Sequence, residues 1–147
     1  MSQSRNPDVA DVAAAVQLSV RLLVRSLRQV TGEGELSLPE MSALARLDRT
    51  GPTTSAALAR EEQISPQSMG STLGSLEERG LVERRADPGD GRRVVLSITP
   101  AGFRVLRNKR SARAKELARA LSTDFTKAEL RQLMAAAPLI ERLAQRI

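Results

Sequence analysis

Apolar residues near both ends of the chain recur at alternating steps of three and four, the spacing of one side of an α-helix. At the N-terminus this pattern predicts a helix over residues 8–30, and near the C-terminus it predicts a helix beginning at Lys127. Pro138 lies inside the second helix, and a proline there should kink the helix or split it in two. The apolar stripes consist of Val16, Val20, Leu23, Leu27 and Val30, and of Leu130, Leu133, Ala137, Ile140, Ala144 and Ile147.

Capping signals predict four more helices between the terminal ones. Ser37 and Glu40 have the spacing of a capping box, Thr54 can cap a short helix, and Ser65 precedes a proline at the first helical position. The helix that Ser65 caps has a narrow apolar stripe. Thr99, also followed by proline, begins a predicted long helix that reaches about residue 121. The narrow stripe is formed by Met69, Leu73 and Leu76.

The period changes after Gly80. Residues 81–85 read as a short strand, residues 86–91 are dense in turn formers, and residues 92–98 alternate in polarity. The alternation predicts that Val94, Leu96 and Ile98 share one face of a second strand. The expected fold class is therefore mainly α with a small β-hairpin.

The helix after Ser65 has a polar but uncharged outer side. Short hydrogen-bonding side chains of this kind suit base edges and phosphate oxygens, and they let a helix lie deep in a major groove. Gly70 and Gly74 cost helix stability, so they indicate either close approach to DNA or close packing on another helix. The outer side carries Gln67, Ser68, Ser71, Thr72 and Ser75.

Four arginines lie around the turn of the predicted hairpin. In a DNA-binding protein they would contact phosphates or enter a narrow minor groove, whereas in another protein they would be solvated surface charges. These residues are Arg84, Arg85, Arg92 and Arg93.

Composition narrows the function classes. The chain has 147 residues and neither cysteine nor histidine, which excludes thiolate and imidazole chemistry, and we expect no metal site and no cofactor. Adjacent carboxylates such as Glu61 and Glu62 or Glu77 and Glu78 are interpreted as solvated faces, so no enzyme is predicted. We expect a cytoplasmic protein, because no signal peptide and no long apolar run is present.

The net charge of +6 favours a polyanionic partner, but its distribution is uneven. Residues 38–98 carry eight basic and nine acidic side chains, whereas residues 99–147 carry eleven basic and four acidic ones. The basic residues of the helix after Thr99 are either solvated or, for Arg104 and Arg107, close enough to the hairpin to attract DNA.

The order of these elements resembles the MarR family, the regulators of multiple antibiotic resistance. The resemblance rests on the stretches SAALA (55–59), ISPQSM (64–69), LEERGLV (76–82), DGR (90–92) and LSITPAG (96–102). Two residues depart from the family pattern: Ala57 stands where a carboxylate is common, and Pro138 lies in a dimerisation helix.

The resemblance implies one domain, residues 1–147, in which residues 8–30 and 100–147 form dimerisation helices and residues 37–98 form a winged helix-turn-helix. It further implies that Arg92 enters the minor groove and that Asp90 orients it by a charge-assisted hydrogen bond. The predicted DNA-binding residues are Thr54, Ser65, Gln67, Ser68, Ser71, Thr72, Ser75, Arg84, Asp90, Arg92 and Arg93.

The predicted function is that of a homodimeric transcriptional regulator, a repressor that binds double-stranded DNA at an inverted repeat. The family resemblance also implies response to a small-molecule effector, for which no binding residue is identified. The alternative is a winged helix that binds only another protein, and this would leave the polar helix face unexplained.

Overall fold

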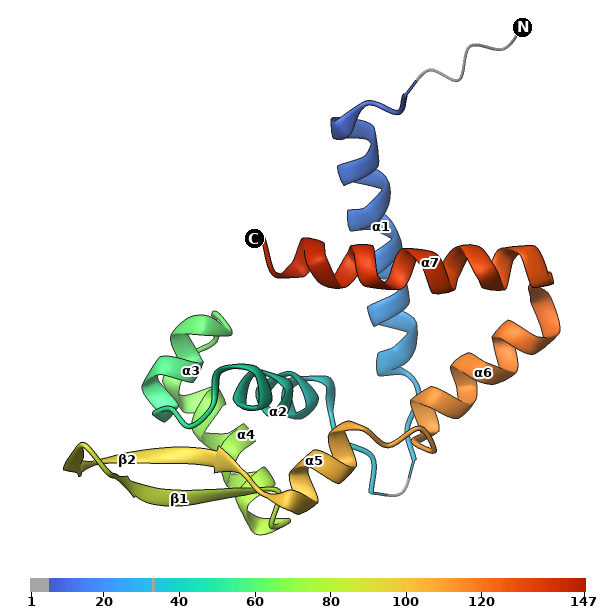
Figure 1. Cartoon of the computed structure of the whole chain (residues 1–147). Helices are drawn as coiled ribbons and strands as arrows, with labels where there is room; N and C mark the ends of the chain where they lie inside the picture. The colour runs from blue at the N-terminus through green and yellow to red at the C-terminus, as the bar shows by residue number, and fades with distance from the viewer. Residues whose placement is uncertain (1–5, 33) are drawn as a thin grey trace, which may run out of the picture. The chain divides into compact units, whose positions relative to one another are not determined.

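The computed structural model describes residues 6–32 and 34–147, which form two compact units. The first unit extends to Lys109 and the second begins at Arg110. The mainly helical fold with one antiparallel hairpin confirms the predicted fold class (Figure 1). In the first unit the elements are α1 (Val9–Arg28), α2 (Leu38–Thr50), α3 (Ser55–Glu61), α4 (Pro66–Glu78), β1 (Val82–Asp87), β2 (Asp90–Ile98) and α5 (Pro100–Leu106), and in the second unit they are α6 (Ala112–Asp124) and α7 (Lys127–Ala144).

The core of the first unit lies among α2, α3, α4 and the hairpin, and we call these elements together the lobe. Its side chains are almost entirely leucine, alanine, valine and methionine, which pack without polar atoms. The segment before α3 joins the hairpin as well, since Thr53 and Leu96 exchange two main-chain hydrogen bonds of 3.1 and 2.7 Å. The largest fully buried side chains are Leu44, Leu47, Leu58, Met69, Leu73, Leu76 and Leu96.

The predicted helix starts are confirmed. Ser37 and Glu40 form the capping box of α2, and Thr126 and Glu129 form that of α7. The other predicted caps each accept a hydrogen bond from a main-chain N–H of the first turn, which satisfies a donor that the helix leaves free. These caps are Thr54, Ser65 and Thr99.

Thr99 also joins the two ends of the hairpin to the helices that flank it. Its hydroxyl donates to the carbonyl of Gly80 at 2.7 Å and accepts from the main-chain N–H of Gly102 at 3.1 Å. Its own N–H donates to the carbonyl of Leu81 at 3.0 Å. Gly80 has a φ of +71°, the left-handed conformation that ends a helix most readily when the residue is glycine. The end of α4, the base of the hairpin and the start of α5 are thereby held at one point.

The prediction of a single long helix after Thr99 is wrong. The helix ends at Leu106, and a new helix, α6, begins at Ala112 after its cap Ser111. The hydroxyl of Ser111 accepts from the N–H of Ala114 at 3.2 Å, so a serine inside the expected helix acts as the start of another. Local side-chain bonding of this kind competes with helix continuation.

Two details add to the predicted pattern. Val94, Leu96 and Ile98 alternate along β2 in an unbroken register, as predicted, but Val94 is half exposed because it pairs with Ala86 near the hairpin turn, away from the base of the hairpin. The helix α7 is not split at Pro138 but continues to Ala144. Proline removes one main-chain donor there without ending the helix.

The helices α1, α6 and α7 contain no buried residue. Large apolar side chains on α1 and α7 are about half exposed, in contrast to those of the lobe. No helix within residues 6–32 and 34–147 has the length and apolarity that crossing a bilayer requires. The exposed apolar residues include Leu18, Leu22 and Leu23 on α1 and Leu133, Leu139, Ile140 and Leu143 on α7.

Gly102 provides a test of the junction at Thr99. A Cβ at this position would lie 2.3 Å from the carbonyl oxygen of Leu81, whereas a Cβ at Gly70 of α4 would meet nothing within 4 Å. We expect Gly102→Ala to lower the free energy of unfolding by roughly 1–3 kcal/mol through overpacking. Gly70→Ala should raise it by up to about 1 kcal/mol through helix propensity. Urea unfolding of both variants is the measurement, and an unchanged midpoint for Gly102→Ala would contradict the described packing.

Candidate nucleic-acid interface

The helix α4 has a buried side and an open side. Met69, Leu73 and Leu76 face the core with at most 1% exposure. Gln67, Ser68 and Ser71 are exposed, while Thr72 is half-buried. The open side therefore presents uncharged hydrogen-bonding groups, as the sequence predicted for its first two turns.

Two predicted DNA-binding hydroxyls cap helices. Ser65 accepts from the N–H of Ser68 at 3.0 Å and donates to the Ser68 hydroxyl at 2.9 Å. Thr54 accepts from the N–H of Ala57 at 3.2 Å and is half-buried. Ser65 and Ser68 thus lie together at the exposed N-terminus of α4.

The glycines of α4 do not pack against another helix in the described chain. A Cβ built at Gly70 or Gly74 meets nothing within 4 Å outside the helix itself. Close helix packing within this protomer therefore does not explain them, and the open side of α4 stays flat at both positions.

Ser75 lies against α2. Its hydroxyl donates to Oε2 of Glu40 at 3.3 Å, and Arg79, one turn later, approaches the same oxygen at 3.8 Å. Arg79 also donates to the carbonyl of Gly34 at 2.6 Å. Ser75 was predicted as a DNA-binding residue, whereas its hydroxyl in the structure bonds a carboxylate of the protein.

The four arginines of the hairpin fall into two groups. Arg84 donates to Glu77 of α4 at 2.7 Å, and Arg85 pairs with Glu83 on its own strand. Arg92 and Arg93, near the turn, are exposed, and their guanidinium groups form no ion pair with residues 6–32 or 34–147.

Asp90 contacts Arg92 through the main chain. Its Oδ1 accepts from the N–H of Arg92 at 3.1 Å, and Asp87 accepts from the N–H of Gly89 at 2.9 Å in the same turn. The predicted hydrogen bond from Asp90 to the Arg92 side chain is replaced by this main-chain bond. The turn is shaped by the aspartates, and the guanidinium group of Arg92 stays available.

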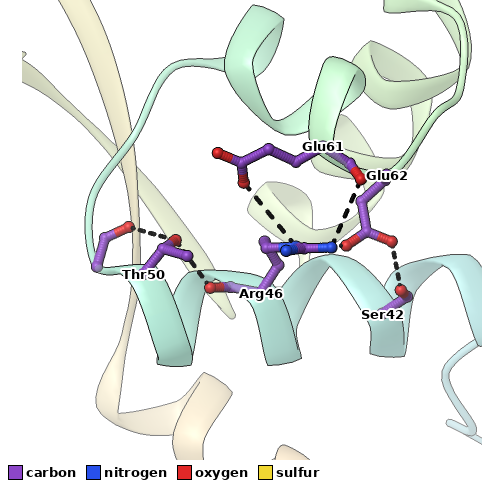
Figure 2. Close-up of polar contacts among 6 residues, drawn as sticks. Ser42, Arg46, Thr50, Glu61 and Glu62 are labelled. Carbon is purple, nitrogen blue, oxygen red and sulfur yellow. Dashed lines mark hydrogen bonds and ion pairs between the residues drawn. The ribbon is translucent and has the colours of Figure 1, made fainter. Parts of the chain in front are cut away.

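A polar network joins α2 to the end of α3 (Figure 2). Glu62 accepts from Ser42 at 2.6 Å and from Nε of Arg46 at 2.8 Å, and Glu61 lies 3.9 Å from the same nitrogen. Burial raises the pKa of the Glu62 carboxyl, but the hydrogen bonds from Ser42 and Arg46 and the positive charge of Arg46 outweigh it and place the pKa below its ordinary value. The network holds α2 against the end of α3, and α4 packs on both of these helices.

Sequence reasoning missed the carboxylates that organise this surface. Glu62 and Glu77 were interpreted as solvated charges, yet each holds an arginine of another element. Arg107, considered for DNA attraction, lies 3.4 Å from Asp48 of α2 and its guanidinium carbon lies 5.5 Å from the ring centre of Phe103. Glu62 lies 16 positions from Arg46 and Asp48 lies 59 positions from Arg107, so no local signal could have identified these two pairs. Within the described residues no three carboxylates gather as metal ligands would.

This arrangement defines a winged helix-turn-helix, with α3 and α4 as the helix pair and the hairpin as the wing. A model of the MarR family matches residues 36–94, which comprise α2, α3, α4, β1 and the start of β2. An HTH-type transcriptional regulator of Mycobacterium tuberculosis is 37% identical over 114 residues, which cover 78% of this chain and 80% of that protein.

Solved structures extend the likeness to nearly the whole chain. A protein from Pseudomonas aeruginosa is 32% identical, with a TM-score of 0.66, and the match covers 95% of this chain and 99% of that one. A mutant of MepR from S. aureus, solved bound to an oligodeoxyribonucleotide, is 18% identical, with a TM-score of 0.58 and coverage of 92% and 98%. The chain belongs to the MarR family of transcriptional regulators.

The network of Glu62 predicts a pH dependence of stability. Because its pKa is lower in the folded than in the unfolded state, its contribution is present above the ordinary value of 4.5 and is lost as the pH falls through the folded value. We expect Glu62→Gln to cost about 1 kcal/mol at neutral pH and to lose part of the acid dependence. Urea unfolding between neutral and acidic pH measures both. Parallel pH profiles for wild type and variant would contradict the assignment, and Glu78→Gln, an exposed carboxylate of α4, is the control.

Proposed function

We propose that this protein is a homodimeric repressor that binds duplex DNA at an inverted repeat, with α4 in the major groove and the hairpin over the adjacent minor groove. The observation that carries the proposal is the exposed, uncharged polar side of α4 in the same lobe as Arg92 and Arg93, which form no ion pair with the described residues. A dimer covering a promoter would exclude polymerase, which is the mode of repression we propose.

The contacts that we propose in the major groove come from the N-terminal half of α4. Gln67 has an amide that can bond two groups of one base, and the hydroxyls of Ser68 and Ser71 accept and donate. Thr72 lies at the edge of this side. The absence of side chains at Gly70 and Gly74 would let the helix backbone approach the bases closely.

The contacts that we propose in the minor groove come from Arg92, with Arg93 on the DNA backbone. Both side chains are exposed on a turn that Asp87 and Asp90 hold through the main chain. A guanidinium group in a narrow minor groove meets enhanced negative potential. Arg84 is the weaker candidate because Glu77 already binds it at 2.7 Å.

Dimerisation is proposed through α1, α6 and α7. Their apolar side chains are exposed in the described chain, and a second copy with two-fold symmetry would bury them. In such a dimer residues 1–147 act as one functional domain, with the lobe at residues 37–98. Response to a small-molecule effector is part of the proposal, but we assign no residue to it.

The test is to select DNA fragments bound by the full chain from genomic DNA and to footprint them. We expect two protected half-sites in inverted orientation, about one helical turn apart, bound by a dimer. A single half-site bound by a monomer would contradict the proposal. Failure to bind duplex DNA even at low salt would instead favour a winged helix that binds another protein.

We expect α4 to provide sequence discrimination and the wing to provide general affinity for DNA, which gives a second prediction. Gln67→Ala and Ser68→Ala should each reduce discrimination between operator and mutated operator by about 1–3 kcal/mol, with little change in nonspecific binding. Arg92→Ala should weaken binding to most sequences and lower the salt slope by about one counterion.

Titrations at several salt concentrations distinguish these effects. Arg142→Ala on α7 makes the same change in charge outside the lobe and serves as the control, at matched dimer content. Equal operator affinity for wild type and Arg92→Ala at physiological salt would refute the role of the wing.

A further inference from the structure

The contacts of Glu40 join three parts of the first unit. Its Oε1 accepts from the main-chain N–H of Ser37 at 3.2 Å in the capping box of α2. Its Oε2 accepts from the hydroxyl of Ser75 of α4 at 3.3 Å and lies 3.8 Å from Nη1 of Arg79, the residue that caps the end of α4. The side chain is only 16% exposed, so most of this carboxylate is surrounded by protein. One side chain thus contacts both the segment before α2 and α4, which we call the reading helix because the proposed function places it in the major groove.

Arg79 adds a second connection between the same two parts. Its Nη2 donates to the carbonyl of Gly34 at 2.6 Å, while its Nη1 faces Glu40. Ser75 and Arg79 are four residues apart, about 6 Å along the helix, and therefore lie on one side of α4. Two attachments at this separation on one side oppose both rotation of α4 about its axis and sliding along it.

The residues held in this way lie between α1 and α2 along the chain, next to the start of α2. Gly34 and Ser37 belong to residues 29–37, which connect α1, assigned by the proposed function to the dimer interface, to α2 in the lobe. Of these, residue 33 lies outside the described residues. In a two-fold dimer, any displacement of α4 relative to its own dimerisation helix changes the separation of the two reading helices. The distance between half-sites that the dimer accepts depends on how firmly α4 is attached.

We propose that Glu40 is a positioning residue that attaches α4, through Ser75 and Arg79, to the segment after α1 and thereby sets the half-site spacing of the operator. This inference rests on the proposed function. It gives Ser75 a role in geometry and not in base contact. It also explains why a polar residue on the reading helix is turned toward a carboxylate, which would repel DNA phosphates.

The variants Ser75→Ala and Arg79→Lys test the attachment. The first removes the hydroxyl that donates to Glu40. The second keeps the positive charge but loses the planar guanidinium group that reaches Gly34 and Glu40 together. Both variants leave Ser37 and Glu40, the two residues of the α2 capping box, in place. Glu78→Gln, on the same turn of α4 and exposed, is the matched control.

The readout is affinity for the selected operator and for versions with one base pair added or removed between the half-sites. Wild type and Glu78→Gln are expected to lose about tenfold in affinity for each change. Ser75→Ala and Arg79→Lys should lose only about threefold, because α4 can shift more freely in each subunit. Affinities are compared at equal folded and dimeric fractions, so a mere loss of stability would leave the ratios between the three operators unchanged.

Unchanged spacing dependence in both variants would overturn the inference, as would a Ser75→Ala effect confined to one base pair of the operator, which would mean that Ser75 reads DNA. Absence of duplex binding by the wild type would overturn the proposed function itself. A double variant whose spacing dependence equals that of either single variant supports one shared attachment.

Discussion

The hydroxyl group of Thr99 makes the contact on which the geometry of the lobe depends. It donates to the carbonyl of Gly80, between α4 and the hairpin, and accepts from the main-chain N–H of Gly102 in the first turn of α5. The direction in which the wing leaves α4 is therefore fixed by main-chain groups and one buried glycine. The turn at the far end of the wing takes no part in this junction. Its side chains can vary without moving the wing, which suits an element whose tip meets a partner.

Net charge describes this surface poorly. Residues 38–98 have one more acidic than basic side chain, yet several of the carboxylates are bound to arginines: Glu62 to Arg46, Glu77 to Arg84 and Glu83 to Arg85. Among the residues that the structure describes, Arg92 and Arg93 at the turn have no such partner. The local potential that a polyanion meets is set by these unpaired groups and not by the sum over the lobe. On this view the acidic residues position the basic ones as much as they oppose them.

Local signals in the sequence predicted the helix starts, since a cap bonds a main-chain group only two or three residues away. The same signals predicted the polar side of α4 and the hairpin. Contacts between distant residues could not be predicted in this way, and Ser75 shows why: its position on the helix suits a groove, but Glu40 lies 35 positions earlier in the sequence. The break at Ser111 was not predicted although its signal was local: a serine whose hydroxyl accepts from a main-chain N–H three residues later, inside a segment predicted as one helix. Alternation placed Val94 on the face of Leu96 and Ile98, but it does not reveal where a hairpin extends beyond the core.

The open space beside Gly70 and Gly74 has a consequence for how this protein can evolve. Alanine fits at both positions, and each replacement would add up to about 1 kcal/mol to a domain whose total stability is typically 5–15 kcal/mol. Selection for heat resistance alone would fill these positions early. Under the proposed function the same replacements would push the helix backbone away from the base pairs. The lobe would then keep a lower melting temperature than its fold allows, because tight binding of DNA requires glycine at both positions.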